Sequence, residues 1–444
     1  MTLNKRLLAA PAIGVAGYFT LGVSVASFGP LDYRGYQDTT VAVYIGLIIL
    51  FFGSCFVLGS RTRLLRKPIW RTDKNQNVLT FIFRASLVIA ILLMTYELLN
   101  AVRTGGLNLN PANSALAYIG TYTDYTRNSG SYSMRFLITS IGAFPLFVAQ
   151  VLGIFYFKEL DKTTRLAVIY LFVVTILVYT LGGGKQKQFG DIMIYVVSVV
   201  LAKKSATGKL KLKTLLIIGG VIVGGVYVLL MLLAFRYQAI GVDLAQLNRS
   251  LHPLIDYHEG YWLESAFGEA FAFPVVMFSG YLSQGYYGLS LSLEQPFTWT
   301  SFAGSSYSVS VILNQFFGAD FWVTRNYPYM VGYATGWDQA KWHTVFAWLA
   351  SDLTFTGVVF FMGAMGFIYG RAWREILLYQ NPFALMMFAM MNIGLAYAPA
   401  NNQLMHSPGG LSTTFAVFAV YFLFHANFNA APTVVRKLRF RMSR

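Results

Sequence analysis

The chain has 444 residues, of which 56% are hydrophobic, 16% aromatic and only 12% charged, and its mean hydropathy is +0.54. A soluble domain usually carries about 25% charged residues, so this composition excludes an ordinary soluble protein and also a disordered one. Cys55 is the single cysteine, which excludes a disulfide scaffold. The composition therefore predicts an all-α polytopic integral membrane protein.

Apolar runs of about 20 residues with few charges are long enough to cross a bilayer as helices. These runs predict three regions: transmembrane helices 1–7 in residues 1–235, a large loop with short helices in 236–344, and transmembrane helices 8–10 with a basic tail in 345–444. The sequence contains about ten such runs, at 7–27, 40–60, 78–98, 136–157, 166–184, 189–202, 214–235, 345–370, 382–398 and 411–431.

The basic residues behind the net charge of +16 are concentrated in alternate links between these spans. Cytoplasmic loops carry the excess of Lys and Arg in membrane proteins, so both chain ends are expected in the cytoplasm and 236–344 on the outer side. The charge thereby reports topology, and we expect no nucleic-acid partner. On this topology 23 of the 34 basic residues, but only four acidic ones, lie in cytoplasmic segments, namely 1–6, 61–77, 158–165, 203–213, 371–381 and 432–444.

A short outer turn, Gly-Gly-Gly-Lys-Gln-Lys-Gln at 182–188, breaks this charge pattern. Three glycines allow a tight backbone turn whose N–H groups can bind an anion. Lys185 and Lys187 place positive charge on the outer face, and a phosphate group is a suitable partner for it. The alternative is that the two lysines contact lipid headgroups of the outer leaflet.

The outer loop 236–344 is long enough to carry a function or a structure of its own. Within it, 251–270 and 271–293 are expected to form helices or membrane-associated elements, the second as a surface or re-entrant segment because of its Gly and Ser content. Eleven Tyr and Trp residues lie between residues 281 and 342. Such rings suit either a membrane interface or stacking on sugar rings.

The segment 249–264, RSLHPLIDYHEGYWLE, combines cations, imidazoles and carboxylates. A helix starting after Pro253 would place Asp256 and Glu259 on one face, with His252 nearby. A cation stabilises a leaving diphosphate, and an imidazole or carboxylate takes a proton from an attacking hydroxyl. The alternative is a structural cluster of ion pairs.

Two further carboxylates, Asp191 and Asp352, lie near the outer ends of predicted spans, where they either face a wet cavity or pair with a cation. The His and carboxylate spacings match no established zinc motif. No Walker, dinucleotide-binding or kinase motif is present either. We therefore expect neither a metal nor a cofactor.

Three segments carry a resemblance to a known family: HTVFAWLASDLTFTGVVFFMGAMGFIYG (343–370), GYLSQGYYGLSLSLEQPF (280–297) and GGGKQKQFG (182–190). With the many spans and the late outer loop, they resemble bacterial O-antigen and oligosaccharide repeat-unit polymerases of the Wzy type. Some members share an Arg followed, after ten residues, by Gly in two outer loops. Here Arg249…Gly260 and Arg325…Gly336 fit that spacing, but both lie in one loop.

The resemblance implies a GT-C-like glycosyltransferase of the bacterial inner membrane whose large periplasmic loop joins undecaprenyl-diphosphate-linked oligosaccharides. The growing chain would pass from its lipid diphosphate to the non-reducing end of the incoming unit, with no cofactor. A chain-length regulator and a flippase are the implied partners. The resemblance implies His252, Glu259 and His343 as candidate bases, and as diphosphate ligands Arg249, Arg325, Arg236, Lys185 and Lys187.

Two other functions fit the same sequence. An O-antigen ligase shares the layout and the lipid-diphosphate donor, but transfers the polymer to lipid A core. A flippase or transporter of lipid-linked oligosaccharides belongs to a different class, and it would be expected to carry charge within many spans, whereas this chain concentrates its polar residues in one outer loop.

Overall fold

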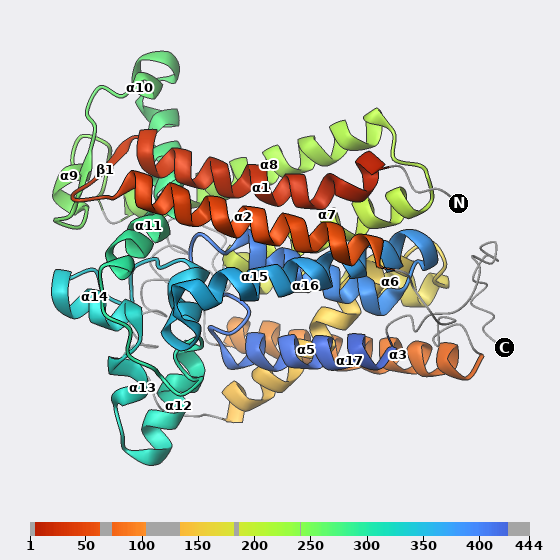
Figure 1. Ribbon diagram of the computed structural model, residues 1–444. Helices are drawn as coiled ribbons and strands as arrows, with labels where there is room; N and C mark the ends of the chain where they lie inside the picture. The colour runs from red at the N-terminus through yellow and green to blue at the C-terminus, as the bar shows by residue number, and fades with distance from the viewer. Residues whose placement is uncertain (1–4, 63–72, 104–133, 182–185, 240, 425–444) are drawn as a thin grey trace.

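The computed structural model describes residues 5–62, 73–103, 134–181, 186–239 and 241–424, which are mostly α-helical (Figure 1). Each predicted span overlaps one helix, and seven of these helices (α1, α2, α3, α5, α6, α8 and α15) are long and apolar enough to cross a membrane. The prediction of an all-α polytopic membrane protein is confirmed. The ten helices are α1 (Lys5–Phe28), α2 (Asp38–Arg61), α3 (Asp73–Arg103), α5 (Met134–Tyr156), α6 (Lys162–Leu181), α7 (Gln186–Ala206), α8 (Leu212–Ala239), α15 (Val345–Tyr379), α16 (Pro382–Ala396) and α17 (Pro408–Phe424).

Helices α1, α2 and α15 pack together, with α2 and α15 parallel to each other and α1 running in the opposite direction (Figure 1). Trp373 Nε1, near the end of α15, donates a hydrogen bond of 3.1 Å to Leu7 O near the start of α1. Arg374 Nη1 donates one of 2.7 Å to Ser60 O near the end of α2. Helix α1 therefore starts where α2 and α15 finish, and we call this the termini end of the bundle and its opposite the loop end.

The contact between α2 and α15 depends on glycine. A Cβ atom at Gly366 would overlap the carbonyl oxygen of Phe52, and one at Gly370 would overlap that of Phe56. Residues four apart share one face of a helix, so these two glycines form a strip on which the backbone of α2 rests. Small residues are the usual means of close helix contact in membranes, because lipid provides little hydrophobic driving force between helices.

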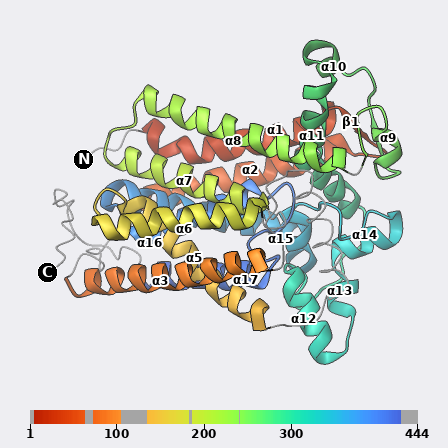
Figure 2. The ribbon, with the colours of Figure 1, turned by 180° about the vertical axis from the view of Figure 1, so that it is seen from behind.

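The predicted outer loop folds into a layer at the loop end (Figures 1 and 2). A short strand from the link between α1 and α2, β1 (Leu31–Tyr33), joins this layer and pairs antiparallel with β2. Thus the link between α1 and α2 and the 236–344 segment form one structure. The elements of the layer from the large segment are α9 (Leu247–Ser250), β2 (Ile255–Tyr257), α10 (Trp262–Phe267), α11 (Glu269–Leu293), α12 (Tyr307–Phe317), α13 (Phe321–Thr324) and α14 (Tyr327–Thr335).

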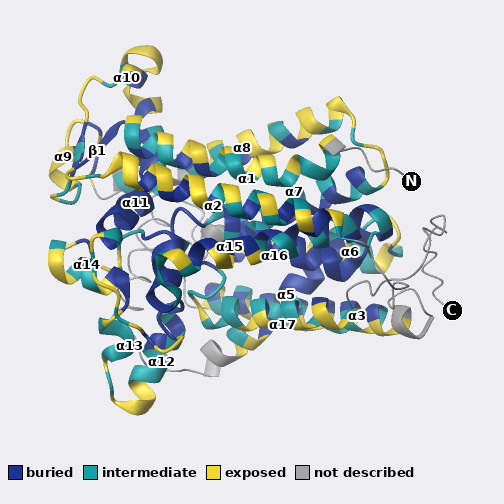
Figure 3. Cartoon of the chain, in the orientation of Figure 1, coloured by how far each residue is buried: buried dark blue, intermediate teal, exposed yellow. Residues whose placement is uncertain are grey.

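Helix α11 differs from the surface or re-entrant segment expected for 271–293. Sixteen of its 25 residues are buried, and Figure 3 draws most of it in dark blue. It packs against α1, α8, α14 and α10, and a Cβ atom at Gly285 would overlap Pro399 O. The small residues that suggested an exposed element instead allow the backbone of α11 to approach its neighbours closely.

Candidate functional site

The two short strands are built on the same three-residue pattern, Leu-Asp-Tyr at 31–33 and Ile-Asp-Tyr at 255–257. Successive strand residues point to opposite faces, so the apolar and tyrosine side chains enter a small core and the aspartates point outward. This core joins β1 and β2 to α11 and to the segment after α14. Its members include Leu31, Tyr33, Leu247, Ile255, Tyr257, Phe273, Tyr287 and Trp337.

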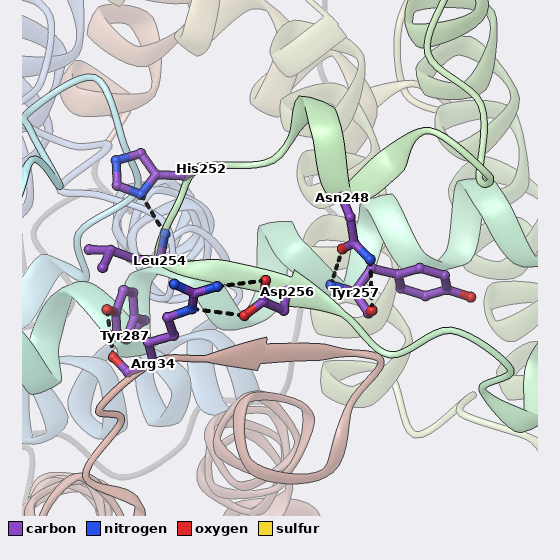
Figure 4. Close-up of polar contacts among 7 residues, drawn as sticks. All are labelled: Arg34, Asn248, His252, Leu254, Asp256, Tyr257 and Tyr287. Carbon is purple, nitrogen blue, oxygen red and sulfur yellow. Dashed lines mark hydrogen bonds and ion pairs between the residues drawn. The ribbon is translucent and has the colours of Figure 1, made fainter.

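The helix expected after Pro253 is wrong, because β2 occupies this position. Asp256 Oδ2 and Oδ1 accept hydrogen bonds from Arg34 Nε (2.8 Å) and Nη2 (3.1 Å) (Figure 4). Asp256 therefore lies across the sheet from β1, and not on a helical face with Glu259. Arg34 belongs to no motif, and the repeated apolar-Asp-Tyr pattern is the one signal in the sequence for this pairing.

Glu259 is linked to α9 through Asn248. Asn248 holds the backbone of Tyr257 with two hydrogen bonds (Figure 4), and its Nδ2 also donates to Glu259 Oε1 at 3.2 Å. Arg249 is the next residue on α9, and both Arg249 and Glu259 are exposed. The structure thus brings this predicted cation and this predicted base to the same edge of the loop end.

His252 links β2 to the turn after α14. With its Nε2 3.2 Å from Gly336 O, the ring donates there, while Nδ1 accepts from Leu254 N at 3.3 Å (Figure 4). Its ring also meets Trp337 edge to face at 5.2 Å. Burial lowers the pKa of His252, as does nearby Lys341. The imidazole is therefore neutral near pH 7, and both of its nitrogens are engaged with the backbone.

His343 lies at the far end of the same turn and is fully buried. Its Nε2 lies 3.0 Å from Asp338 O and donates to it. The ring packs on Gly288 of α11, where a Cβ atom would be 2.8 Å from Nδ1. Burial lowers the pKa of His343 to about 4, so the two histidines fix the two ends of the 336–343 turn as neutral rings.

This burial predicts a loss of stability in acid. The unfolded chain takes up a proton on His343 near pH 6.5, whereas the folded protein does so only near pH 4. Between these two values, each pH unit of acidification therefore lowers the free energy of unfolding by about 1.4 kcal/mol. The contribution of neutral His343 to stability is fully present above pH 6.5. Melting temperatures of the detergent-solubilised protein from pH 7 to 4.5 should fall less steeply for His343→Gln. The exposed His258→Gln should behave as wild type, and an unchanged slope in His343→Gln would contradict the assignment.

The turn and α14 border a small, open pocket of about 310 Å³. Two exposed phenol rings, Tyr329 and Tyr333, line it together with Asp338 and Gln339. Gln339 Nε2 donates to Asn326 Oδ1 at 2.9 Å, and the N-cap hydrogen bond from Tyr329 N to the same oxygen fixes the start of α14. We call this cavity the α14 pocket. Its tyrosines belong to the aromatic group noted in the sequence between residues 281 and 342, whereas Asp338 lies in no motif.

Among the predicted diphosphate ligands, Arg325 lies nearest to this pocket along the chain. It directly precedes Asn326 and is exposed, with its guanidinium 5.0 Å from the centre of the Phe321 ring. Lys185 lies outside the described residues, and so do the side chains of Lys187 and Arg236. These three residues stay predictions.

Asp352 serves the structure of the loop end and does not face a wet cavity. Its carboxylate accepts hydrogen bonds from Thr300 Oγ1, from Gly304 N (3.3 Å) and from Ser305 N (2.7 Å) and Oγ (2.6 Å). The other carboxylate, Asp191, is hydrogen-bonded to the Tyr397 hydroxyl. Asp352 therefore has neutral hydrogen-bonding partners in place of the cation expected as one alternative.

Asp352→Ala should lower the free energy of unfolding by about 3 kcal/mol, because it leaves several buried donors of the 300–305 turn without an acceptor. Asp352→Asn should lower it by less, since one carbonyl oxygen still accepts. Thermal unfolding in detergent measures both. Equal melting temperatures for wild type and the Ala variant would show that water replaces the carboxylate.

Comparison with protein-family models, curated proteins and solved structures finds no match to this chain. Over the described ranges, no group of three or more His, Cys, Asp or Glu side chains is placed to hold a metal ion. The fold defines the class: a multi-pass α-helical membrane protein whose loop end carries a folded layer.

Proposed function

We propose that the protein is a membrane glycosyltransferase that joins undecaprenyl-diphosphate-linked oligosaccharide units into a surface polysaccharide at the periplasmic face of a bacterial inner membrane. The α14 pocket carries this proposal. Its tyrosine rings suit stacking on sugar rings, and Asp338 and Gln339 suit hydrogen bonds to hydroxyl groups. Its volume of about 310 Å³ is at the lower end of small-molecule sites.

In the proposed reaction, a hydroxyl oxygen at the non-reducing end of the incoming unit bonds to the anomeric carbon of the growing chain. The bond from that carbon to the diphosphate oxygen breaks, and the lipid diphosphate leaves with the electron pair. The Asp338 carboxylate takes the hydroxyl proton. Arg325 offsets the negative charge that develops on the leaving group. The reaction needs no nucleotide, because the lipid diphosphate both activates the growing chain and serves as the leaving group.

This proposal changes the role of two residues that were candidate bases. His252 and His343 have nitrogens committed to Gly336 O and Asp338 O, so they act as positioning residues that hold the turn bearing Asp338. Glu259 is exposed, accepts a hydrogen bond from Asn248 and stays a second candidate base. The remaining predicted cations, Arg249 included, stay candidates for the diphosphate.

The test combines two assays. A deletion strain should lose the long polysaccharide ladder and keep a single repeat attached to core, and the purified protein in vesicles should join labelled lipid-linked units. Accumulation of lipid-linked polymer in the deletion strain would instead identify a ligase. Movement of labelled units across the vesicle membrane without joining would identify a transporter, and an unchanged ladder would remove both transferase functions.

A further inference from the structure

A second, larger cavity of about 920 Å³ lies between α5, α6 and α7. Figure 2 shows α6 and α7 side by side. Its lining includes Gln380, which directly follows α15, so the cavity opens at the termini end. It is separate from the α14 pocket and lies at the other end of the bundle.

The walls of this cavity are apolar and reach the lipid-facing surface. Phe172 and Ile176 of α6 face Val196 and Val200 of α7 across it. Val173, which also lines the cavity, is half exposed on the outside of the bundle. The cavity is therefore an apolar groove with a side opening, which suits a hydrocarbon chain entering from the bilayer.

The mouth of the groove is cationic. Lys158, Lys203, Lys204 and Lys209 line it. Lys203 Nζ lies 3.1 Å from Glu159 Oε1, and Glu159 is the one acidic side chain among the described residues that line the groove. Four ammonium groups against one carboxylate leave an excess of three positive charges at the end of an apolar slot.

We propose that this groove binds an anionic phospholipid, with an acyl chain between α6 and α7 and its phosphate at the lysines. Basic pockets between transmembrane helices attract anionic headgroups, and the apolar walls supply an affinity for the chain that a soluble anion lacks. The lipid bridges three helices in the folded protein, so its binding stabilises the bundle. The inference does not depend on the proposed function.

The test uses purified full-length protein in a neutral detergent. Titration with phosphatidylglycerol, followed by native mass spectrometry and thermal unfolding, should give a saturable complex and a higher melting temperature. Phosphatidylcholine with the same chains should bind at least tenfold more weakly, and glycerol phosphate should not bind. Equal binding of the two lipids, or binding of glycerol phosphate alone, would overturn the proposal.

Variants separate the two parts of the site. The triple change Lys158→Gln, Lys204→Gln and Lys209→Gln should weaken phosphatidylglycerol binding about 100-fold, at about fivefold for each charge removed. The matched control is the triple change Lys162→Gln, Lys211→Gln and Lys213→Gln. These three lysines lie near the same end of the bundle but do not line the groove. An equal loss in this control would reduce the effect to general surface charge and overturn the proposal.

Val200→Trp tests the apolar part, because it fills the slot while leaving the lysines in place. It should lose the phosphatidylglycerol-dependent rise in melting temperature. Undiminished binding by a folded Val200→Trp protein would exclude an acyl chain in the groove. If this variant does not fold, the lysine variants still decide the proposal.

Discussion

Asp338→Asn is expected to lower the rate of polymer formation at least 100-fold, while the protein accumulates in membranes as wild type does. The carboxamide keeps the size of the side chain and an oxygen that accepts from Ala340 N, as Asp338 Oδ1 does at 3.0 Å. It cannot take a proton from the attacking hydroxyl, and the loss of a positioned base typically costs 10²–10⁴ in rate. The measurement is the joining of labelled lipid-linked units by the purified variant in vesicles.

A matched control is Asp320→Asn, which changes another exposed aspartate of the same layer, at the start of α13, that does not line the α14 pocket. It should join units at the wild-type rate. Full activity of Asp338→Asn would remove the α14 pocket from the proposed reaction and return attention to Glu259. A loss in both variants would indicate a general effect of charge on the loop end.

Seven of the expected spans coincide with helices long and apolar enough to cross a membrane, and they could be predicted from sequence because a membrane imposes one simple requirement. A helix that crosses needs an uninterrupted apolar run, and such a run is visible without any tertiary information. The expected run at 345–370 begins at the same residue as α15, which then continues to Tyr379. That extension depends on packing, since Trp373 is buried against the start of α1.

The loop end was harder to predict because its structure depends on contacts between distant segments. Strand β2 is only three residues long and exists through pairing with β1, so the sequence near Pro253 does not by itself indicate a strand. In α11, Gly and Ser were taken as signs of exposure, but burial against Pro399 and the 342–344 segment requires the same small residues. Composition alone does not distinguish these two causes.

The candidate site shows the same limit at the level of single residues. His252 and His343 both belong to the 236–344 segment, yet the sequence does not reveal that ring nitrogens of both meet the backbone. Asp338 carried no motif, and its interest comes from the cavity formed with Tyr329 and Tyr333. A residue type suggests which chemistry is available, whereas the surrounding contacts decide which groups remain accessible.

The glycine strip leads to the largest expected effect on folding. Gly366→Leu should prevent accumulation of well-folded protein, because a side chain there overlaps the backbone of α2 at Phe52. Rearrangement of flexible side chains cannot relieve an overlap with backbone, so α2 and α15 must separate. Overpacking usually costs about 1–3 kcal/mol, and we expect at least the upper value in this case. Size-exclusion profiles and melting temperatures of the solubilised variant measure the effect.

Gly46→Leu provides the control on α2 itself, since a side chain at Gly46 meets nothing within 4 Å. It should give a monodisperse protein with a nearly unchanged melting temperature. A wild-type melting temperature for Gly366→Leu would mean that α2 and α15 tolerate a wider separation than their glycines suggest. β1 directly precedes α2, and Asp352 lies near the start of α15, so both are carried by these two helices. If the two helices can separate without loss of stability, contacts other than the α2–α15 interface must hold the loop end together.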